Sequence, residues 1–272
     1  MRWLDANRLH AQHGPIDLII SADDVDVAAI TGRVFPEILP DLVTELFKLR
    51  QAGGGRFRGP VAQRMATAVA PFVPAFITPM AAVAGSVADH VLSHLVQSGS
   101  PRAWVNNGGD IAVHLTGGHT FTVGICTDPD RRSHQATLRL TPEDNIGGIA
   151  TSGWRGRSQS LGIADAVTVL AGNAAVADAA ATMIANRVDL PDHPGIIRAP
   201  ATDLLPDSDL GRTPVTTAVP TLSGPDVAMA MTSGLHYAQT LIAKGVIVAA
   251  YLDLQGQFEV VSDTGAPKLQ RT

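Results

Sequence analysis

The sequence predicts an α+β fold in which mixed or antiparallel sheets are flanked by alanine-rich helices. Segments with apolar residues at helical spacing alternate with short apolar runs, and these runs begin or end at glycine turns. These segments do not follow a strict strand–helix repeat, so a doubly wound parallel sheet is not expected. Because the 272 residues are 45% hydrophobic but only 4% aromatic, the core must consist mainly of alanine, valine, leucine and isoleucine.

Four elements are predicted in the first hundred residues. Residues 8–23 form a hairpin, because an apolar strand follows a His-Gly-Pro turn. Residues 36–51 carry leucines at helical spacing before a run of three glycines, which predicts a helix. Residues 61–72 alternate imperfectly between apolar and polar side chains and are interpreted as a strand. Residues 78–99 begin with Thr-Pro and end in glycine, the pattern of a capped helix.

The middle of the chain combines strands with one alanine-rich helix. Residues 102–128 predict strands around two Gly-Gly turns. Residues 148–172 predict a strand, a polar loop and a second strand. Residues 173–186, with the sequence NAAVADAAATMIAN, follow as a helix whose small side chains would let a ligand approach closely.

The last third begins with an irregular segment. Residues 198–225 are rich in proline, aspartate and threonine and are expected to form a loop or extended arm, with a short strand over residues 215–219. Residues 226–245 predict a final helix that ends at a glycine, and residues 246–262 predict a hairpin. We therefore expect a single domain over residues 1–262 and a flexible C-terminal tail over residues 263–272.

Composition and charge exclude several classes of partner. The formal net charge is -5 and no block of lysine or arginine occurs, so neither nucleic acid nor an anionic membrane is expected. Cys126 is the only cysteine, which excludes an intramolecular disulfide, and its apolar context predicts a small core residue. The start lacks a signal-peptide pattern, and the apolar runs are shorter than the ~20 residues of a membrane helix. A cytoplasmic protein is expected.

The alanine-rich helix carries one carboxylate, Asp178, and one hydroxyl, Thr182, four residues apart. In a helix this spacing places both side chains on one face, one turn apart. Carboxylate and hydroxyl oxygens are hard ligands of the kind that suits Mg²⁺ or Ca²⁺. The alternative is structural, with the aspartate capping or pairing in the first turn and the threonine bonded to a backbone carbonyl.

A second candidate is the loop GIATSGWRGRS of residues 148–158. It presents Thr-Ser-Gly followed by two arginines, which joins hydroxyl and backbone donors to guanidinium groups. Because arginine binds phosphate through two parallel hydrogen bonds, this loop is a candidate anion cradle. Taken alone, the same pattern also fits a solvated turn.

Two further patterns are candidate ligand sites. Residues 106–113, NNGGDIAV, place two glycines after a strand, where the backbone could approach a ligand closely or form a simple hairpin turn. His90 and His94 are four residues apart in a predicted helix, so both could face one metal ion. A third ligand is not identifiable, and the sequence offers no Gly-x-Ser-x-Gly elbow for a hydrolase.

Four segments in this order resemble the ApbE superfamily, whose well-known members are FAD:protein FMN transferases. MAAVAGSVADHV is similar to the family's first helix motif, WVNNGGDIAV to its Gly-Gly-Asp segment, IATSG to its Ala-Thr-Ser-Gly, and AVTVLAGNAAVADAAATMI to its metal-binding helix. The match is closer still to an uncharacterised ApbE-related family of cytoplasmic bacterial and archaeal proteins. The resemblance implies an ApbE-like fold and covers most of residues 14–255.

The resemblance implies a magnesium ion on a flavin pyrophosphate. Its ligands would be Asp178, Thr182 and a backbone carbonyl near Ala81 or Ala82. The ion would neutralise charge that develops as the pyrophosphate breaks. FAD or a related nucleotide would be the small-molecule ligand, and a target protein and a homodimer stay open as partners. The residues expected to contact the nucleotide are Asn107, Gly108, Gly109, Asp110, Thr151, Ser152, Gly153 and Ser158.

Two departures from the family pattern concern catalysis. Gly162 stands where the resemblance places a catalytic histidine, and Ala84 stands where it places a lysine. Loss of a general base costs roughly 10²- to 10⁴-fold in rate. Asp165 keeps the family's acid, and with Arg155 and Arg157 it is the candidate catalytic group.

Three hypotheses follow from these residues. The first is a magnesium-dependent FMN transferase, and the second is a flavin or nucleotide binder or cofactor-maturation protein without transfer. The third is a structural partner subunit with no small ligand. The metal pair favours the first two over the third, and the missing histidine and lysine favour the second over the first.

Overall fold

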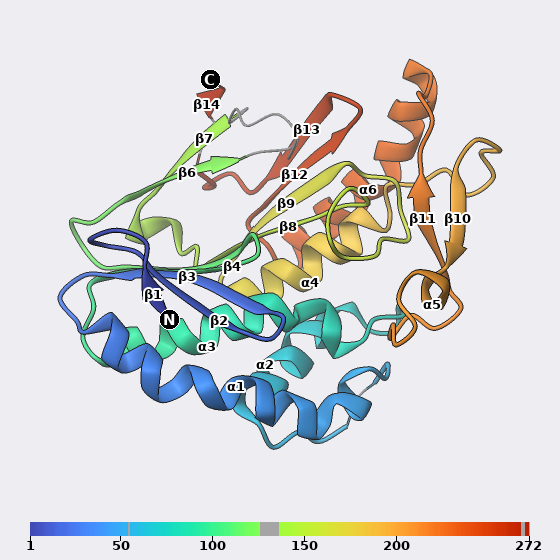
Figure 1. Cartoon of the computed structure of the whole chain (residues 1–272). Coiled ribbons are helices and arrows are strands. Elements are labelled where there is room, and N and C mark those ends of the chain that lie inside the picture. Colours follow the sequence, from blue (N-terminus) through green and yellow to red (C-terminus); the bar gives the residue numbers. More distant parts are fainter. Residues whose placement is uncertain (54, 126–135, 268–269, 272) are drawn as a thin grey trace. The chain divides into compact units, whose positions relative to one another are not determined.

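A computed structural model describes residues 1–53, 55–125, 136–267 and 270–271 (Figure 1). Cys126, predicted to be a core residue, lies outside these residues. The chain divides into two compact units. Unit 1 comprises Met1–Phe121, Leu140–Ala150 and Leu170–Ala179, and unit 2 comprises Thr122–Arg139, Thr151–Val169 and Ala180–Thr272.

Unit 1 contains an antiparallel sheet with the strand order β1-β2-β3-β4-β5-β8. The predicted hairpins are confirmed, because His13 pairs with Ile16 and Asn107 pairs with Asp110 around their turns. β8 continues into unit 2 with its last two residues. The strands are β1 Arg2–Trp3, β2 Leu9–His13, β3 Ile16–Ala22, β4 Arg102–Asn107, β5 Asp110–Leu115 and β8 Gly148–Ser152.

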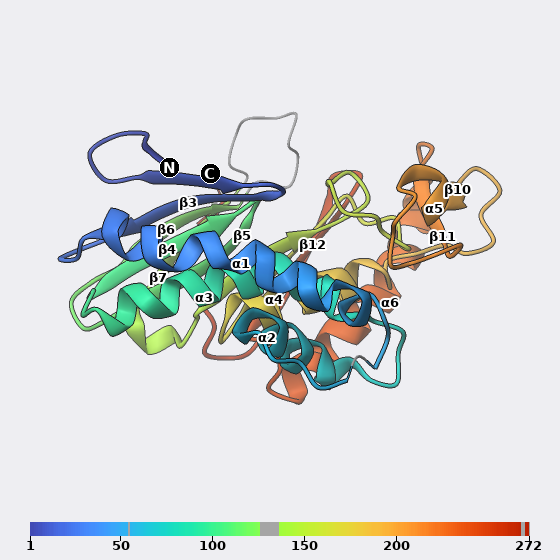
Figure 2. The same cartoon turned by 60° about the horizontal axis from the view of Figure 1, so that its bottom comes forward.

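Three helices cover one face of this sheet (Figure 2). They are α1 Val27–Leu49, α2 Pro60–Val69 and α3 Val83–Gln97. Their apolar faces and the inward-facing residues of β2 to β5 form one buried core. The expected helix over 78–99 is confirmed, although its first turn is the separate 3₁₀ helix Pro79–Ala82. The expected helix over 36–51 is confirmed within the longer α1.

The strand predicted over residues 61–72 is wrong. This segment forms α2 and the 3₁₀ helix Ala70–Phe72. Gly59 precedes the helix, and Pro60 at its first position supplies a backbone angle already suited to a helix. The buried residues recur at helical spacing, so the apparent alternation resulted from small alanines on both faces: Val61, Ala62, Met65, Ala68 and Val69.

Unit 2 contains the strand order β9-β12-β13, with α6 packed against β12 and β13. A second small sheet has the order β14-β7-β6. The helix predicted over 226–245 and the hairpin predicted over 246–262 are confirmed. Its elements are β6 Phe121–Ile125, β7 Ala136–Leu140, β9 Ala166–Ala171, α6 Gly224–Ala243, β12 Ala249–Leu254, β13 Gln257–Ser262 and β14 Gln270–Arg271. The first residue of β6, the last residue of β7 and the last two residues of β9 belong to unit 1, as does the 3₁₀ helix Pro142–Asp144.

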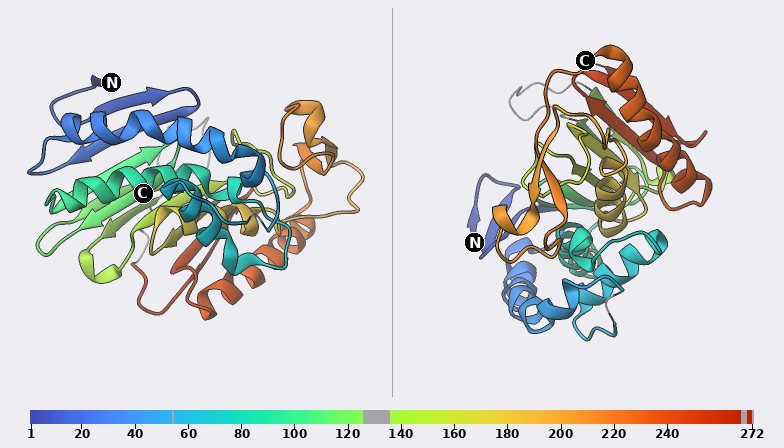
Figure 3. Two further views of the ribbon diagram at one scale, coloured as in Figure 1. Left: turned by 90° about the horizontal axis from the view of Figure 1, so that it is seen from below. Right: turned by 90° about the vertical axis from the view of Figure 1, so that its right-hand side faces the viewer.

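The segment of unit 2 expected to be a loop or extended arm is more ordered than its composition suggests, and the short strand predicted over residues 215–219 is confirmed. β10, Ile197–Pro200, and β11, Pro214–Ala218, pair antiparallel, and the short helix α5, Ala201–Leu204, lies at one end of the pair (Figure 3). We call β10, α5 and β11 with their connections the arm. An isolated two-stranded ribbon is only marginally stable, so contacts with its neighbours must hold the arm in place.

The alanine-rich helix is confirmed as α4, Ala174–Ala185, which begins in unit 1 and ends in unit 2. The predicted α+β class with antiparallel sheets and alanine-rich helices is also confirmed. The expected flexible tail and single-domain boundaries stay predictions. Among the described residues, no helix combines the length and apolar character required to cross a membrane.

Candidate functional site

Asp178 lies on the first half of α4, in unit 1, and contacts the start of α3. One of its carboxylate oxygens accepts a hydrogen bond of 3.0 Å from the amide of Gly85. Glycine permits this approach, because a Cβ at Gly85 would overlap the backbone carbonyl of Ala174. Asp178 therefore satisfies an amide of the first turn of α3, which has no partner within that helix.

A second carboxylate makes the reverse contact. Asp89 of α3 is only 7% exposed, and its two oxygens accept hydrogen bonds from the amides of Ala174, at 3.0 Å, and Ala175, at 2.9 Å. Each helix thus supplies a carboxylate to the amino end of the other. We call this arrangement the reciprocal cap. Sequence reasoning did not assign a role to Asp89, although it lies in the segment MAAVAGSVADHV that resembles the family's first helix motif, four residues after Gly85.

The surroundings of the reciprocal cap disfavour the ionised forms of Asp178 and Asp89. Burial, followed by repulsion from Asp110, raises the pKa of Asp178 well above 3.8, and the amides of Gly85 and Ala84 only partly oppose this. Burial likewise raises the pKa of Asp89 to about 6, although the hydrogen bonds from the amides of Ala175 and Ala174 act to lower it. Unit 1 therefore concentrates negative charge where solvent stabilises it poorly.

The glycine turn between β4 and β5 belongs to the same unit. Gly108 and Gly109 have φ angles of 68° and 115°, which only glycine adopts without strain. The Asn107 side chain donates to the carbonyl of Ala84 at 3.1 Å, which connects this turn to the start of α3. The structure therefore places Asn107, Asp110 and Asp178 around one helix start, while Thr182 follows one helical turn beyond Asp178 and lies in unit 2.

This donor set fits a hard divalent cation. Asp178 and Asp110 are close enough to repel each other, and a cation would relieve that repulsion. Carboxylate and hydroxyl oxygens are the ligands that Mg²⁺ prefers, and one or two protein carboxylates are usual for it. The binding of a cation by Asp178 and Thr182 stays a prediction.

The predicted anion cradle lies in unit 2. Thr151 and Thr168 share a hydrogen bond of 2.8 Å between their hydroxyls, which joins β8 to the following strand. Gly153 is buried, and a Cβ there would overlap the carbonyl of Asp165. Three side chains of the loop are exposed: Arg155, Arg157 and Ser158.

Asp165 holds the near end of this loop. Its carboxylate accepts from the Trp154 indole at 2.9 Å, from Arg155 Nε at 2.6 Å and from the amide of Gln255 at 2.6 Å. The Arg155 guanidinium also lies over the Trp154 ring, 5.2 Å from its centroid. Asp165 thus anchors Arg155, one of the two candidate catalytic arginines, on the loop.

Gly162 is tightly enclosed. A Cβ at this position would overlap the backbone carbonyl of Ala185 and approach that of Val188 at 2.7 Å. Leu161 and Ile163 on either side are bonded to the end of α4, through the Asn186 side chain and the Val188 carbonyl. The position of the family histidine therefore has no room for any side chain unless the backbone moves.

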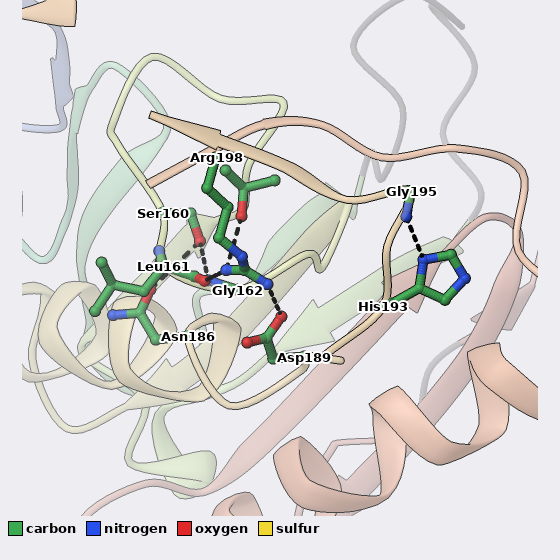
Figure 4. A network of polar contacts seen from close by, with 9 residues as sticks. Ser160, Leu161, Gly162, Asn186, Asp189, His193, Gly195 and Arg198 are labelled. Atoms are coloured by element: carbon green, nitrogen blue, oxygen red, sulfur yellow. Dashed lines mark hydrogen bonds and ion pairs between the residues drawn. The ribbon is translucent and has the colours of Figure 1, made fainter. Parts of the chain in front are cut away.

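A polar network in unit 2 was not predicted from the sequence. Arg198 of the arm pairs with Asp189 at 2.6 Å and donates to the carbonyl of Leu161 (Figure 4). Asn186 at the end of α4 accepts from the Leu161 amide at 2.9 Å. A lone arginine in a proline-rich segment carries no pattern, so only the fold reveals its partners.

His90 and His94, which the sequence offered as a possible pair of metal ligands, do not form a metal centre with a third such side chain among the described residues. The rings of His90 and His94 lie edge to face with centroids 4.9 Å apart. Burial, followed by the charges of His94 and Arg64, lowers the pKa of His90 to about 4. In the part of the chain that the structure describes, no three His, Cys, Asp or Glu side chains are arranged to hold a metal ion. A small cavity lined by His90, Glu37 and Asp41 contains none of the predicted site residues.

Comparison with known proteins gives a family and two sets of relatives. A family model described as AbpE bacteria matches residues 1–260. The UPF0280 protein of Methanothermobacter thermautotrophicus is 41% identical over 116 residues, which cover 43% of this chain and 44% of that protein. The UPF0280 protein of Methanosphaerula palustris is 38% identical over 140 residues, or 51% and 55% of the two chains. The chain thus spans about half the length of the curated relatives it matches.

Two solved structures share the fold over nearly the whole chain. The flavinyl transferase ApbE of Pseudomonas stutzeri in its apo form superimposes with a TM-score of 0.53 at 14% identity, covering 96% of this chain and 97% of that one. The flavin transferase ApbE of Vibrio cholerae gives a TM-score of 0.50 at 13% identity, covering 95% and 97%. At these identities the likeness concerns the fold alone.

Proposed function

The chain belongs to the family described as AbpE bacteria, and from this premise we propose that it binds a flavin nucleotide together with a divalent cation, Mg²⁺ in the first instance. The flavin-transferase-like fold supports the nucleotide class. The observation that carries the proposal is the environment of Asp178. Its partly buried carboxylate lies beside a second carboxylate and keeps a raised pKa.

Such an arrangement disfavours the folded state of the free protein. A carboxyl group whose pKa is raised on folding lowers the stability of the folded state at neutral pH, where the same group is ionised in the unfolded chain. Structural helices can be capped by one hydrogen-bonded side chain without a second carboxylate nearby. A bound cation removes the penalty, because both carboxylates then face an opposite charge.

The residues of each unit have separate tasks in this proposal. In unit 1, the bare backbone of Gly108 and Gly109 would let a ligand approach closely. In unit 2, Arg157 and Ser158 would offer exposed donors to phosphate oxygens, and Arg155, whose Nε is bonded to Asp165, would add its positive charge. The bound cation would neutralise charge on a diphosphate. The remaining predicted contacts, Thr151, Ser152 and Gly153, belong to the same proposal.

FMN transfer is the second candidate function. In that reaction a protein hydroxyl oxygen attacks the FMN phosphorus of FAD, its proton passes to a base, and the pyrophosphate bond breaks to release AMP. Asp165 with Arg155 and Arg157 would supply the acid–base and charge-stabilising groups. The enclosed Gly162 favours binding without transfer, because the position that the resemblance gives to the histidine holds no side chain. A protein acceptor, a homodimer, a cytoplasmic location and the absence of a nucleic-acid partner stay predictions.

Titration calorimetry with FAD, with and without Mg²⁺, tests the proposal. We expect binding that requires Mg²⁺ and that is lost in Asp178→Ala and weakened in Thr182→Val, which removes only the hydroxyl. Asp192→Asn, an exposed aspartate, serves as the control. To separate transfer from binding, the protein is incubated with FAD, Mg²⁺ and a threonine-containing acceptor protein, and the release of AMP is measured by chromatography. Failure of the wild-type protein to bind FAD under any of these conditions would refute the proposal.

A further inference from the structure

The loop of residues 155–162 is hydrogen-bonded to the arm near its C-terminal end. Its near end is anchored by Asp165, as described above. At the far end, the Gln159 amide donates to the carbonyl of Ala201 at 2.9 Å, and the Ser208 hydroxyl donates to the Gln159 side chain. The carbonyl of Ser160 accepts from the amide of Thr216 at 2.9 Å. All these partners belong to the arm.

Arg198 connects three segments at this point (Figure 4). One terminal nitrogen of its guanidinium pairs with Asp189, just beyond α4, and the other donates to the carbonyl of Leu161 in the loop. The same nitrogen lies 3.4 Å from the hydroxyl of Thr216 on β11. Both members of the Arg198–Asp189 pair are only 19% exposed at their side chains, so the pair is shielded from solvent.

Arginine is suited to this position for a geometric reason. Its planar guanidinium directs several N–H groups at fixed angles, so one side chain can bind a carboxylate and a carbonyl at once. A lysine carries the same charge, but its single ammonium group cannot reproduce that fork. The arrangement therefore depends on the shape of the group as well as on its charge.

We propose that Arg198 is a positioning residue for the nucleotide site. By joining the arm and the end of α4 to Leu161, it fixes the conformation in which the loop presents Arg155, Arg157 and Ser158 to a phosphate-bearing ligand. Arg198 does not contact the ligand itself. The inference rests on the proposed function, because the loop is assigned there as the phosphate-binding segment.

The test uses the full chain with Arg198→Lys, which keeps the charge, and Arg212→Lys, an exposed arginine of the same arm, as the matched control. Calorimetry should show an affinity for FAD with Mg²⁺ about tenfold weaker in Arg198→Lys, as expected for lost charge-assisted hydrogen bonds. Hydrogen exchange of the free protein should show faster exchange at the amides of Leu161 and Ile163. Neither change is expected in Arg212→Lys.

Chemical rescue provides the readout that a purely structural role would not give. Guanidinium ion at low millimolar concentration should restore FAD affinity to Arg198→Ala but not to Asp178→Ala. Unchanged affinity in Arg198→Lys, or faster exchange without any loss of affinity, would overturn the inference while leaving the proposed function intact. A wild-type protein that binds no FAD would overturn both, so the two failures are distinguishable.

Discussion

The carboxylate of Asp178 accepts a 3.0 Å hydrogen bond from the amide of Gly85, so the side chain expected to hold a cation also caps α3. The structural and the functional interpretations of Asp178 are therefore not alternatives. One oxygen can satisfy the helix while the other faces an ion. The cap orients the carboxylate, and the nearby charge of Asp110 makes the same position electrostatically costly without a cation.

Asp178→Asn should separate stability from binding. The amide cannot ionise but keeps a carbonyl oxygen for Gly85, so the penalty of the raised pKa disappears at pH 8. The melting temperature of the free protein should rise by about 2–4 °C, the effect of about 1 kcal/mol in a chain of this size. The stabilisation by Mg²⁺ and FAD should vanish, as measured by thermal unfolding. A variant that melts lower and still responds to Mg²⁺ would contradict this, and Asp192→Asn should behave as wild type.

Asp89→Asn should change how stability depends on pH. Because its pKa rises from 3.8 to about 6 on folding, the folded state binds the extra proton, and this contribution to stability is lost as pH rises through about 6. Removing the carboxyl should make the slope of unfolding free energy against pH more positive by up to about 1.4 kcal/mol per unit between pH 4 and 6. Urea unfolding across this range measures it. The exposed Asp203→Asn should leave the slope unchanged.

His90→Gln should have the opposite effect. The pKa of this imidazole falls from 6.5 to about 4 on folding, so its contribution to stability is present above 6.5 and is lost as pH falls toward 4. The variant should therefore lose less stability on acidification than the wild type in the same urea series. His236→Gln, at an exposed position of α6, is the control. An acid sensitivity equal to that of the wild type would show that His90 titrates normally.

Gly162→His should not create a transferase. Its Cβ would overlap the carbonyl of Ala185, so the expected result is a destabilised protein without AMP release. Gly162→Ala adds only the Cβ atom and should lower the free energy of unfolding by roughly 1–3 kcal/mol, the usual effect of overpacking. Gly172→Ala, where a Cβ meets nothing within 4 Å, should be nearly neutral. AMP release by a stable Gly162→His protein would show that the surrounding backbone can yield.

Much of the fold could be predicted because neighbouring residues in the sequence determine where several helices and hairpins form. α3 and α6 follow from apolar spacing and terminal glycines, and the hairpins follow from their turn residues. α2 could not be identified in this way, because alanines on both of its faces hide the helical period. Of the arm, only the strand over residues 215–219 was predicted, since proline and aspartate weaken the local signals of β10 and α5.

The residues of the site show where sequence and tertiary structure divide. Asp178 and Thr182 could be identified from the sequence, because four residues of one helix always lie one turn apart. The cap from Asp89 to Ala174 and the contact of Arg198 with Leu161 join residues 85 and 37 positions apart. Only the packing of whole elements brings such groups together, and no local pattern encodes that packing. The sequence by itself therefore determined which side chains could bind a cation and a nucleotide, whereas the tertiary structure decided which groups cap, enclose and position them.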